Sequence, residues 1–600
     1  MPIARLALDL PVSCLFDYRV ADDAKPPVGS RLRVPFGRGE KVGVVVSLHE
    51  ESEVPPEQIK EALGLADDLP PLPREFFRLC EFASQYYQVP LGEAIHQALP
   101  PALKKPRPGK RRAGKAKADR VAAEPVLPAL NAEQEFAVRT VAASRGYAPF
   151  LLYGVTGSGK TEVYLRLIAE TLARGRQALL LVPEINLTPQ LETRLGERFP
   201  AQPIAMLHSD LGEAARERAW KAAFLGEARI VIGTRLAVFT PMPELGLILV
   251  DEEHDASYKQ QEGMRYSARD LAIYRASLGK FPIVLGSATP SLESWARAGQ
   301  GTREDQGKQG RYRLLSLTER AVAQACLPQV RLLDTRRMKL ADGLSPPLLE
   351  ALRERLQKGE QSLVFLNRRG YAPVLACPAC GWISRCTRCA ANLVVHLKDR
   401  RLRCHHCALE IHIPRACPVC GNQDIHPFGR GTQRIEDTLS GIFPQARILR
   451  VDRDSVKSRR QWEALLARIH AGEADILVGT QMLAKGHDFP RLTLVGVVGA
   501  DAALHAADWR APERLFAQLM QVAGRAGRAD LPGEVLIQSE TPQHPLYQAV
   551  VTHDYPGYAR RLLDERRQAG FPPYAYQALL RAEAPQMESA LAFLKEAAAG

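Results

Sequence analysis

Four C-x2-C cysteine pairs lie close together in this chain, and they constrain its fold more than any other feature. Eight of the eleven cysteines fall in this block, between Cys377 and Cys420. Thiolates paired at this spacing are typical zinc ligands, and eight of them suit two tetrahedral sites of four cysteines each. Iron–sulfur ligation is the alternative, but regular C-x2-C pairs favour zinc. The sequence therefore predicts a metal-bound module rather than a disulfide framework.

The spacing also favours one of the three ways in which four pairs can combine. Residues 393–397 and 401–403 predict the two strands of a β-hairpin between the second and third pairs. A hairpin that joins two such pairs forms a zinc ribbon, so these pairs are expected to share one ion and the outer pairs the other. The predicted ligands are Cys377, Cys380, Cys417 and Cys420 for one zinc, and Cys386, Cys389, Cys404 and Cys407 for the other.

The length of 600 residues predicts about four domains, because a single hydrophobic core rarely serves so long a chain. The composition, 46% hydrophobic and 24% charged, is ordinary for a folded protein. Charged residues within the first 20 positions exclude the apolar core of a signal peptide. No apolar run reaches the roughly 18 residues that a membrane span requires. We therefore expect a protein of the reducing cytoplasm without membrane contacts.

Positive charge is concentrated in one segment. The formal net charge is +13, and residues 103–120 hold nine Lys or Arg against a single acid, Asp119. The segment also contains prolines and glycines and almost no apolar side chains, so it predicts a disordered linker. It is either a solvated spacer or an arm that binds phosphates without regard to sequence.

A phosphate-binding loop follows a predicted strand at 151–153 and precedes a helical pattern that starts at Glu162. It fits the pattern G-x4-G-K-[ST], in which glycines let backbone N–H groups surround phosphates at a helix N-terminus. Lys160 is expected to reach the β- and γ-phosphates of ATP, and Thr161 to bind Mg²⁺. The predicted loop residues are Gly154, Val155, Thr156, Gly157, Ser158, Gly159, Lys160 and Thr161.

An acidic run, Asp251-Glu252-Glu253-His254, ends the apolar segment 247–250. This pattern predicts a buried parallel strand that delivers acids at its carboxyl end, beside the phosphate-binding loop. We assign Asp251 to Mg²⁺, directly or through water, and Glu252 to polarising the attacking water. A capping cluster at a strand end is the alternative interpretation.

Further motifs follow in order, and with them the chain resembles superfamily 2 helicases of the DEAH-like type. The matching segments are 183–190, 233–235, 286–290, 366–370, 479–489 and 521–528. The resemblance implies an α/β fold with two RecA-like lobes, and an adenine contact at Gln134. Gln521, Arg525 and Arg528 are expected catalytic residues, because planar guanidinium groups stabilise charge on the transferred phosphoryl group. We expect the two arginines one helical turn apart, facing the cleft between the lobes.

Helicase motifs interrupted by a cysteine block resemble the PriA family, the bacterial primosomal protein N′, over most of the chain. The first hundred residues predict a β-rich domain, with 31–37 and 41–46 as paired strands. The family's pocket for a DNA 3′ end corresponds to Phe16, Asp17, Gly37 and Lys60. Residues 257–266 resemble its aromatic-rich loop, although Met264 stands where Trp is usual. The motor's expected DNA contacts are Thr234, Arg235, Tyr258, Lys259 and Tyr266.

The resemblance implies the following plan of domains. It comprises an N-terminal DNA 3′-end-binding domain (1–102), a basic linker without the family's winged-helix domain (103–128), lobe 1 (129–327), lobe 2 (328–545) with its double-zinc insertion (374–424), and the start of a C-terminal domain (546–600). All three ligands follow from the motifs: ATP, Mg²⁺ and two Zn²⁺ per chain.

The implied function is an ATP-dependent 3′→5′ DNA helicase that recognises stalled or abandoned replication forks and initiates primosome assembly. Its expected partners are forked and single-stranded DNA, single-strand DNA-binding protein, other primosome components and, indirectly, the replicative helicase. It would act in the cytoplasm, on the nucleoid. The alternatives are a generic superfamily 2 DNA translocase or RNA helicase, and a DNA-bound scaffold whose ATP site is only a switch.

Overall fold

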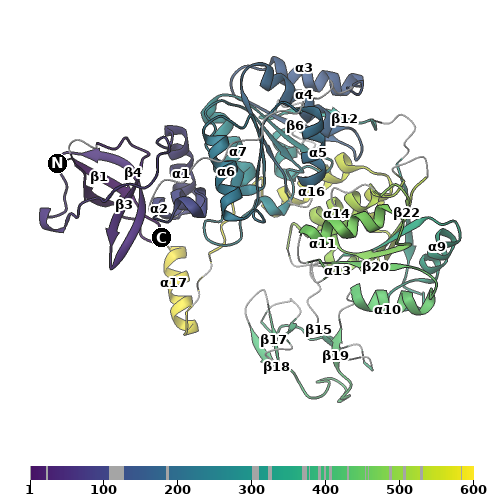
Figure 1. The fold of residues 1–600 in the computed structure, drawn as a ribbon. Coiled ribbons are helices and arrows are strands. Elements are labelled where there is room, and N and C mark those ends of the chain that lie inside the picture. Colours follow the sequence, from purple (N-terminus) through teal and green to yellow (C-terminus); the bar gives the residue numbers. More distant parts are fainter. Residues whose placement is uncertain are drawn as a thin grey trace.

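The computed structural model describes residues 2–599, with the exception of several internal segments. These are 22–24, 107–126, 184–187, 300–309, 322–326, 368–373, 378, 381, 389–392, 397–399, 405–408, 429–431, 453–454, 457–458, 485–488, 505–507, 528–531, 581 and 583. Within the described residues the chain forms four sheets (Figure 1). No helix in the described part of the chain is both long and apolar enough to cross a membrane. Most of the predicted basic linker, at 107–126, lies outside the described residues.

The N-terminal domain contains an antiparallel sheet, as its sequence predicts, and two helices follow this sheet. The strand pair expected at 31–37 and 41–46 is confirmed, with Arg31 opposite Val44 and Phe36 opposite Gly39. Alternating apolar residues of these strands fill one apolar cluster. The elements are β1 (Ile3–Ala7), β2 (Phe16–Arg19), β3 (Arg31–Phe36), β4 (Gly39–His49), β5 (Gly64–Leu65), α1 (Arg74–Tyr87) and α2 (Leu91–Ala98), with the strands ordered β2-β1-β4-β3-β5.

Lobe 1 is a parallel sheet whose strand order is β12-β6-β11-β10-β7-β9-β8. Alternate residues of its central strands belong to two separate apolar clusters, one on each face, which explains their continuous apolar runs. The strands are β6 (Ala148–Gly154), β7 (Gln177–Leu181), β8 (Ile204–Leu207), β9 (Ile230–Gly233), β10 (Leu245–Asp251), β11 (Pro282–Ser287) and β12 (Arg313–Leu317). The helices are α3 (Ala132–Ala143), α4 (Lys160–Ala173), α5 (Thr188–Arg198), α6 (Glu213–Phe224), α7 (Ala268–Gly279) and α8 (Leu292–Arg297).

The register of lobe 1 brings the predicted motifs to one edge. Leu152 of β6, Gly286 of β11 and Asp251 of β10 are level across three neighbouring parallel strands. The strands predicted at 151–153 and 247–250 are thus confirmed, and the segments that follow them leave the sheet side by side.

Lobe 2 repeats this architecture in a second parallel sheet, ordered β13-β23-β22-β14-β21-β20. Its strands are β13 (Gln329–Asp334), β14 (Gln361–Leu366), β20 (Ile448–Val451), β21 (Ile476–Gly479), β22 (Leu492–Val498) and β23 (Glu534–Ser539). Its helices are α9 (Pro346–Gln357), α10 (Thr432–Ile442), α11 (Arg459–His470), α12 (Gln481–Ala484), α13 (Asp501–Leu504) and α14 (Ala511–Ala523). The two RecA-like lobes expected from the motifs are therefore present.

The cysteine block forms a small antiparallel sheet between β14 and α10, set apart from the lobe 2 sheet in Figure 1. Its strands are β15 (Val374–Ala376), β16 (Val394–His396), β17 (Arg401–Arg403), β18 (Glu410–His412) and β19 (His426–Phe428). The predicted hairpin is confirmed, because β16 pairs with β17 and Val394 lies opposite Arg403.

Three helices follow lobe 2: α15 (Pro545–Val551), α16 (Tyr555–Ala569) and α17 (Met587–Ala599). α16 contacts α8 of lobe 1 and lies between the two lobes (Figure 1). At the other end of the molecule, α1 packs against α7 of lobe 1, where Phe82 stacks on Tyr274 with ring centroids 3.8 Å apart. Lobe 1 is thus in contact with both terminal parts of the chain.

Candidate ATPase site, zinc centre and DNA interface

The phosphate-binding loop connects β6 to α4. Gly157 and Gly159 have φ values of +84° and +81°, which glycine adopts without strain, and Lys160 is the first residue of α4. The Lys160 ammonium donates to Gly154 O at 2.7 Å. A helix N-terminus preceded by glycines in these conformations presents backbone N–H groups to an anion, so the loop fits a nucleotide phosphate.

The Gln134 side chain contacts the phosphate-binding loop in this structure, and its expected contact with adenine stays a prediction. Its Oε1 accepts from Asn131 N at 3.0 Å and its Nε2 donates to Ser158 O at 2.9 Å. The side chain is buried, since only 3% of the residue is exposed. Both ends of the amide are therefore engaged, one in a helix capping box and one on the loop.

The two predicted acids lie at the carboxyl end of β10, close to α4. Tyr164 of α4 donates its hydroxyl to Asp251 Oδ1 at 3.0 Å. Burial, together with the neighbouring Glu252 carboxylate, raises the pKa of Asp251 to about 6. A bound cation would stabilise the ionised form of this carboxyl group, which burial and the nearby Glu252 carboxylate disfavour.

Glu252 combines backbone strain with an unsatisfied buried oxygen. Its φ is +46°, an unusual value for a residue with a side chain. Its Oε2 is buried without a hydrogen-bond donor in the described structure, and His254 Nδ1 lies 3.5 Å away. Strained residues with unpaired polar atoms concentrate at functional sites. The geometry therefore fits a carboxylate that acts on a water molecule.

Two further residues of the acidic run form contacts that sequence reasoning missed. Glu253 accepts from Ser291 N at 2.6 Å and from Arg269 at 3.0 Å, and His254 Nδ1 lies 2.7 Å from Ser287 Oγ. Both link the acids to the segment 286–290 and to α8. The sequence did contain a hint of these contacts. Glu253 and His254 belong to the acidic run, and the segment 286–290, which holds small polar residues, ends the adjacent strand.

The arginine-bearing segment of lobe 2 approaches the phosphate-binding loop directly. A Cβ added at Gly524 would lie only 2.5 Å from the methyl carbon of Thr156, so the two lobes meet at this point. α14 ends at Ala523, and Arg525 lies in the turn beyond it, 7% exposed. Arg525 therefore directly follows the residue at which the lobes meet, and its expected spacing of one helical turn from Arg528 stays a prediction. Arg528 lies outside the described residues.

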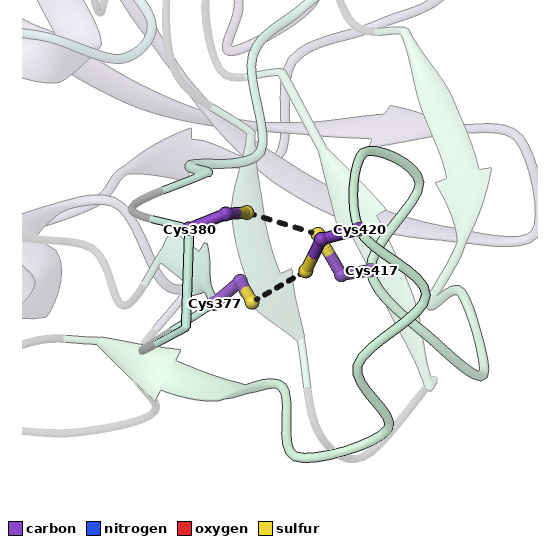
Figure 2. A group of neighbouring side chains, drawn as sticks. All are labelled: Cys377, Cys380, Cys417 and Cys420. Carbon is purple, nitrogen blue, oxygen red and sulfur yellow. Dashed lines mark hydrogen bonds between the residues drawn. The ribbon is translucent and has the colours of Figure 1, made fainter.

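Four cysteines of the block converge on one point. The Sγ atoms of Cys377, Cys380, Cys417 and Cys420 all lie within 4.8 Å of one another (Figure 2). The Cys377–Cys420 and Cys380–Cys417 sulfur pairs are each 3.5 Å apart. Tetrahedral zinc with bonds of about 2.3 Å needs sulfurs about 3.8 Å apart, so the cluster fits zinc. The cluster therefore combines the first and fourth C-x2-C pairs, which is the combination that the spacing predicts.

The second predicted zinc site is described only in part. Cys386 and Cys404 belong to the same small apolar cluster with Leu402, on the hairpin side of the insertion. Cys389 and Cys407 lie outside the described residues.

In the predicted pocket for a DNA 3′ end, the Asp17 side chain is buried. The Asp17 carboxylate is 3% exposed and accepts from Arg5 Nε at 2.8 Å and from Ser52 Oγ at 2.6 Å. The Arg5 guanidinium holds the pKa of Asp17 below its usual range. Lys60 is exposed, and Gly37, with φ +58°, has open space where a Cβ would be.

Phe16 and Asp17 are neighbours on β2, so their side chains start from opposite faces of the sheet. The Phe16 ring packs edge-on against Phe36, with centroids 5.6 Å apart. The Phe16 ring and the Asp17 carboxylate therefore have different surroundings, although both belong to the predicted pocket for a DNA 3′ end.

Two of the expected DNA contacts, both tyrosines, are core residues. Tyr258 is 2% exposed and donates to Leu181 O at 2.9 Å and Asp251 O at 2.6 Å. Tyr266 is fully buried and packs against Phe239 with centroids 5.0 Å apart. Neither ring is available to a nucleic-acid base in this structure, which corrects that assignment.

Three other residues of the loop, of which only Lys259 is exposed, contact the N-terminal domain. Lys259 Nζ lies 5.0 Å from the ring centroid of Tyr87. Met264 N donates to Gln97 Oε1 at 3.3 Å, and Ser267 N to Tyr87 OH at 3.1 Å. Tyr87 and Gln97 were missed from the sequence, because nothing local marks them as partners of a loop in another domain.

Thr234 and Arg235 follow β9, close to the same loop. Both residues are half-buried, and Arg235 donates to Ser257 O at 3.1 Å. The loop from 257 to 267 is therefore held between the strand ends of lobe 1 and the helices of the N-terminal domain.

Four models of known protein families match segments of this chain. Residues 5–100 match the PriA 3′ DNA-binding domain, and residues 386–411 match the Cys-rich region of PriA DNA helicase. The chain is 39% identical over 655 residues to the replication restart protein PriA of Haemophilus influenzae, which covers 97% of this chain and 88% of that protein. The chain belongs to the PriA family. Its lobes match the DEAD/DEAH box helicase domain at 131–298 and the helicase conserved C-terminal domain at 422–530.

Two further relatives carry the same name, replication restart protein PriA. The Bacillus subtilis protein is 45% identical over 447 residues, which cover 74% of this chain and 54% of that protein. The Rickettsia conorii protein is 38% identical over 584 residues, 96% of this chain and 86% of that protein. The match to the PriA Cys-rich region contains the second and third cysteine pairs, the ribbon predicted from the hairpin.

Serine substitution tests the grouping of the described thiolates. Cys377→Ser and Cys417→Ser should each lose one zinc, and the double variant should lose no more than either single variant, because both residues hold the same ion. Zinc binding contributes roughly 10–16 kcal/mol in small zinc-finger peptides, a term that a serine ligand cannot sustain. Elemental analysis of the purified protein measures this, with Cys80→Ser as the control. Loss of two ions by the double variant would contradict the grouping.

The burial of Tyr266 leads to a prediction that separates stability from DNA binding. Tyr266→Ala should lower the free energy of unfolding by about 3–5 kcal/mol, as aromatic-to-alanine changes in cores do. Lys259→Ala should lower the free energy of unfolding by about 1 kcal/mol at most, the value of an exposed cation–π contact, and weaken binding of single-stranded DNA. Calorimetry and fluorescence anisotropy measure the two effects. A stable Tyr266→Ala variant with a specific loss of DNA affinity would restore the stacking role.

Proposed function

We propose that this protein is an ATP-dependent 3′→5′ DNA helicase that recognises stalled or abandoned replication forks and initiates primosome assembly. The proposal is carried by one observation: the acids and the phosphate-binding loop meet at one sheet edge in a chain that also contains a 3′ DNA-binding domain and a PriA Cys-rich region. Relatives that align with nearly the whole chain bear the name replication restart protein. We place its action in the cytoplasm, on the nucleoid.

Each residue of the site has a role in this proposal. ATP would supply the γ-phosphoryl group transferred to water, with Mg²⁺ neutralising its oxygens. Lys160 would leave Gly154 O to hold the phosphates, and Thr161 and Asp251 would hold the Mg²⁺. Glu252 would orient the attacking water and accept its proton through its unpaired buried oxygen. The lobe 2 groups that stabilise the transferred charge are Gln521, Arg525 and Arg528.

The loop after β10 supports a link between DNA contact and hydrolysis. Arg235 donates to Ser257 O. Tyr258, which follows Ser257 in the chain, donates to Asp251 O. DNA that engages Thr234, Arg235 or Lys259 would therefore act on a loop bonded to the backbone of the Mg²⁺ ligand.

The remaining parts of the proposal concern partners and metal content. We propose two Zn²⁺ per chain, with the second site formed by the second and third cysteine pairs. Forked and single-stranded DNA are the proposed substrates. Single-strand DNA-binding protein, other primosome components and, indirectly, the replicative helicase are the proposed protein partners.

A generic superfamily 2 translocase or RNA helicase is the competing function. The two are separated by comparing ATPase rates with forked DNA, blunt duplex, single-stranded DNA and RNA under identical conditions. A restart helicase should be stimulated most by forks. Equal stimulation by duplex, or preferential stimulation by RNA, would favour the competing function.

Substitutions in the nucleotide site should separate hydrolysis from DNA binding. Lys160→Ala and Glu252→Gln should abolish DNA-stimulated ATPase activity and leave fork affinity largely intact, because neither side chain lies in the N-terminal domain. Loss of an arginine that stabilises the transferred phosphoryl group typically costs about 10³-fold or more, so Arg525→Ala and Arg528→Ala should be nearly inactive.

Phosphate release and fork anisotropy measure these two properties. Arg174→Ala is the matched control, because this exposed arginine lies at the far end of the same helix α4. Turnover by Arg525→Ala and Arg528→Ala at the wild-type rate would remove the arginine assignments.

The Asp17 assignment leads to a prediction about substrate choice. A carboxylate that accepts from a free 3′-hydroxyl forms a charge-assisted hydrogen bond of about 1.5–3 kcal/mol. Asp17→Ala should therefore weaken forks with a 3′-hydroxyl about tenfold or more, and change forks with a 3′-phosphate little.

The control must account for the contacts of Asp17 with Arg5 and Ser52. Ser52→Ala removes one contact and keeps the carboxylate. Within each variant, the affinity for forks with a 3′-hydroxyl is divided by the affinity for forks with a 3′-phosphate. A general loss of structure would lower both affinities and leave this ratio unchanged. An unchanged ratio in Asp17→Ala would make the N-terminal domain a general DNA clamp.

A further inference from the structure

Helix α8 carries two carboxylate contacts at its start, one from each lobe. The backbone N–H of Ser291 donates to Glu253, in the acidic run of lobe 1. The next N–H, that of Leu292, donates to Glu513 Oε1 at 2.9 Å, and Glu513 lies in the first turn of α14 in lobe 2. Consecutive backbone groups of one short helix therefore connect the acids of lobe 1 to the helix that leads to Arg525.

Arg566 of α16 holds Glu513 in place. Its NH2 group donates to Glu513 Oε2 at 2.6 Å, and its NH1 group lies 3.6 Å from Glu293 Oε1 of α8. The Arg566 side chain is 5% exposed, and its guanidinium also lies 4.4 Å from the ring centroid of Trp509. Arg566 is buried and lies beside carboxylates from both lobes. Its loss would leave the Glu513 carboxylate buried without a counter-charge, which is costly.

The other end of α16 also touches both lobes. Tyr555 donates its hydroxyl to Pro290 O at 2.6 Å, in the segment that precedes α8. Its ring centroid lies 5.7 Å from Tyr153, directly before the phosphate-binding loop, and 6.1 Å from Phe516 of α14. Figure 1 shows α16 between the lobes, as these contacts require.

We propose that Glu513 and Arg566 are positioning residues for ATP hydrolysis, which set the distance of Arg525 from the phosphate-binding loop by holding α14 against α8. We call the contact of these three helices the α8/α14/α16 junction. The proposal rests on the proposed ATPase function and extends it, because it assigns a role in hydrolysis to a helix that lies beyond both helicase domains.

The size of the expected loss in ATPase rate follows from the way α14 connects the junction to Arg525. α14 continues from Glu513 in its first turn to its end at Ala523, and the next residue, Gly524, contacts Thr156. A displacement at the start of α14 is therefore passed to Arg525 by a continuous helix. Misplacement of a reacting group by about 1 Å can cost on the order of 100-fold in rate.

The experiment uses the full chain with Arg566→Ala, Glu513→Ala and Glu513→Gln. Arg561→Ala is the matched control, an arginine of the same helix whose side chain is 56% exposed and pairs with Glu565 of α16. Amide hydrogen exchange of the peptide that contains Leu292 reports the junction directly. Steady-state ATPase with forked DNA, binding of a fluorescent ATP analogue and thermal unfolding report its consequence.

Exchange at Leu292 should become faster in Glu513→Ala and Arg566→Ala and stay unchanged in Arg561→Ala. The kcat of the two alanine variants should fall tenfold or more, with KM for ATP and nucleotide affinity within about twofold of wild type. Glu513→Gln keeps an acceptor for Leu292 N–H, so it should retain slower exchange and higher kcat than Glu513→Ala. A charge swap, Glu513→Arg with Arg566→Glu, should not restore activity, because arginine offers no acceptor to that N–H.

Unchanged exchange at Leu292 in both alanine variants would overturn the junction. Faster exchange with kcat within twofold of wild type would overturn the positioning role. Rescue by the charge swap would reduce the junction to an ion pair and overturn the role of Leu292 N–H. If the wild-type protein shows no DNA-stimulated ATPase, the proposed function fails, and the exchange measurement still decides the junction.

Discussion

The level pairing of β6, β11 and β10 is the constraint on which the nucleotide site depends. Parallel strands release their following segments at one edge, so the phosphate-binding loop after β6 and the acids after β10 meet there. α4 then closes the arrangement, because Tyr164 reaches across to Asp251. A shift of β10 by one residue would move Asp251 to the other face of the sheet and separate it from Lys160.

Buried carboxylates connect this site to the rest of the molecule. A buried charge is costly unless it is paired and hydrogen-bonded, so each such group specifies a narrow set of neighbours. Glu253 meets that requirement with Arg269 and the start of α8, and Glu513 meets it with Arg566 and the next backbone N–H of α8. The two lobes are therefore joined where the acids lie, by polar contacts that have few alternative arrangements.

A second set of contacts runs from the acids to the N-terminal domain. Tyr258 ties the loop after β10 to the backbone of Asp251, while Tyr87 and Gln97 hold the far end of that loop. The domain that matches a 3′ DNA-binding module is therefore linked through this one loop to the backbone of Asp251. In the proposed function, these contacts would carry the effect of DNA binding at the N-terminal domain to the nucleotide site.

The sequence by itself determined the features that depend on local pattern. Glycine spacing and Lys160 marked the phosphate-binding loop, apolar runs marked β6 and β10, and the C-x2-C spacing with its hairpin favoured the grouping now seen at Cys377 and Cys417. Each of these follows from neighbours a few residues away, where backbone geometry and ligand spacing act directly.

Only the tertiary structure decided which side chains are buried and what they contact. It turned Tyr258 and Tyr266 from DNA contacts into core residues, used the Gln134 amide within the protein, paired Asp17 with Arg5, and placed Arg525 beyond the end of α14. The contact between Leu292 and Glu513 joins residues 221 positions apart. Burial and partner choice depend on how distant elements pack, and no local pattern of residue types encodes that packing.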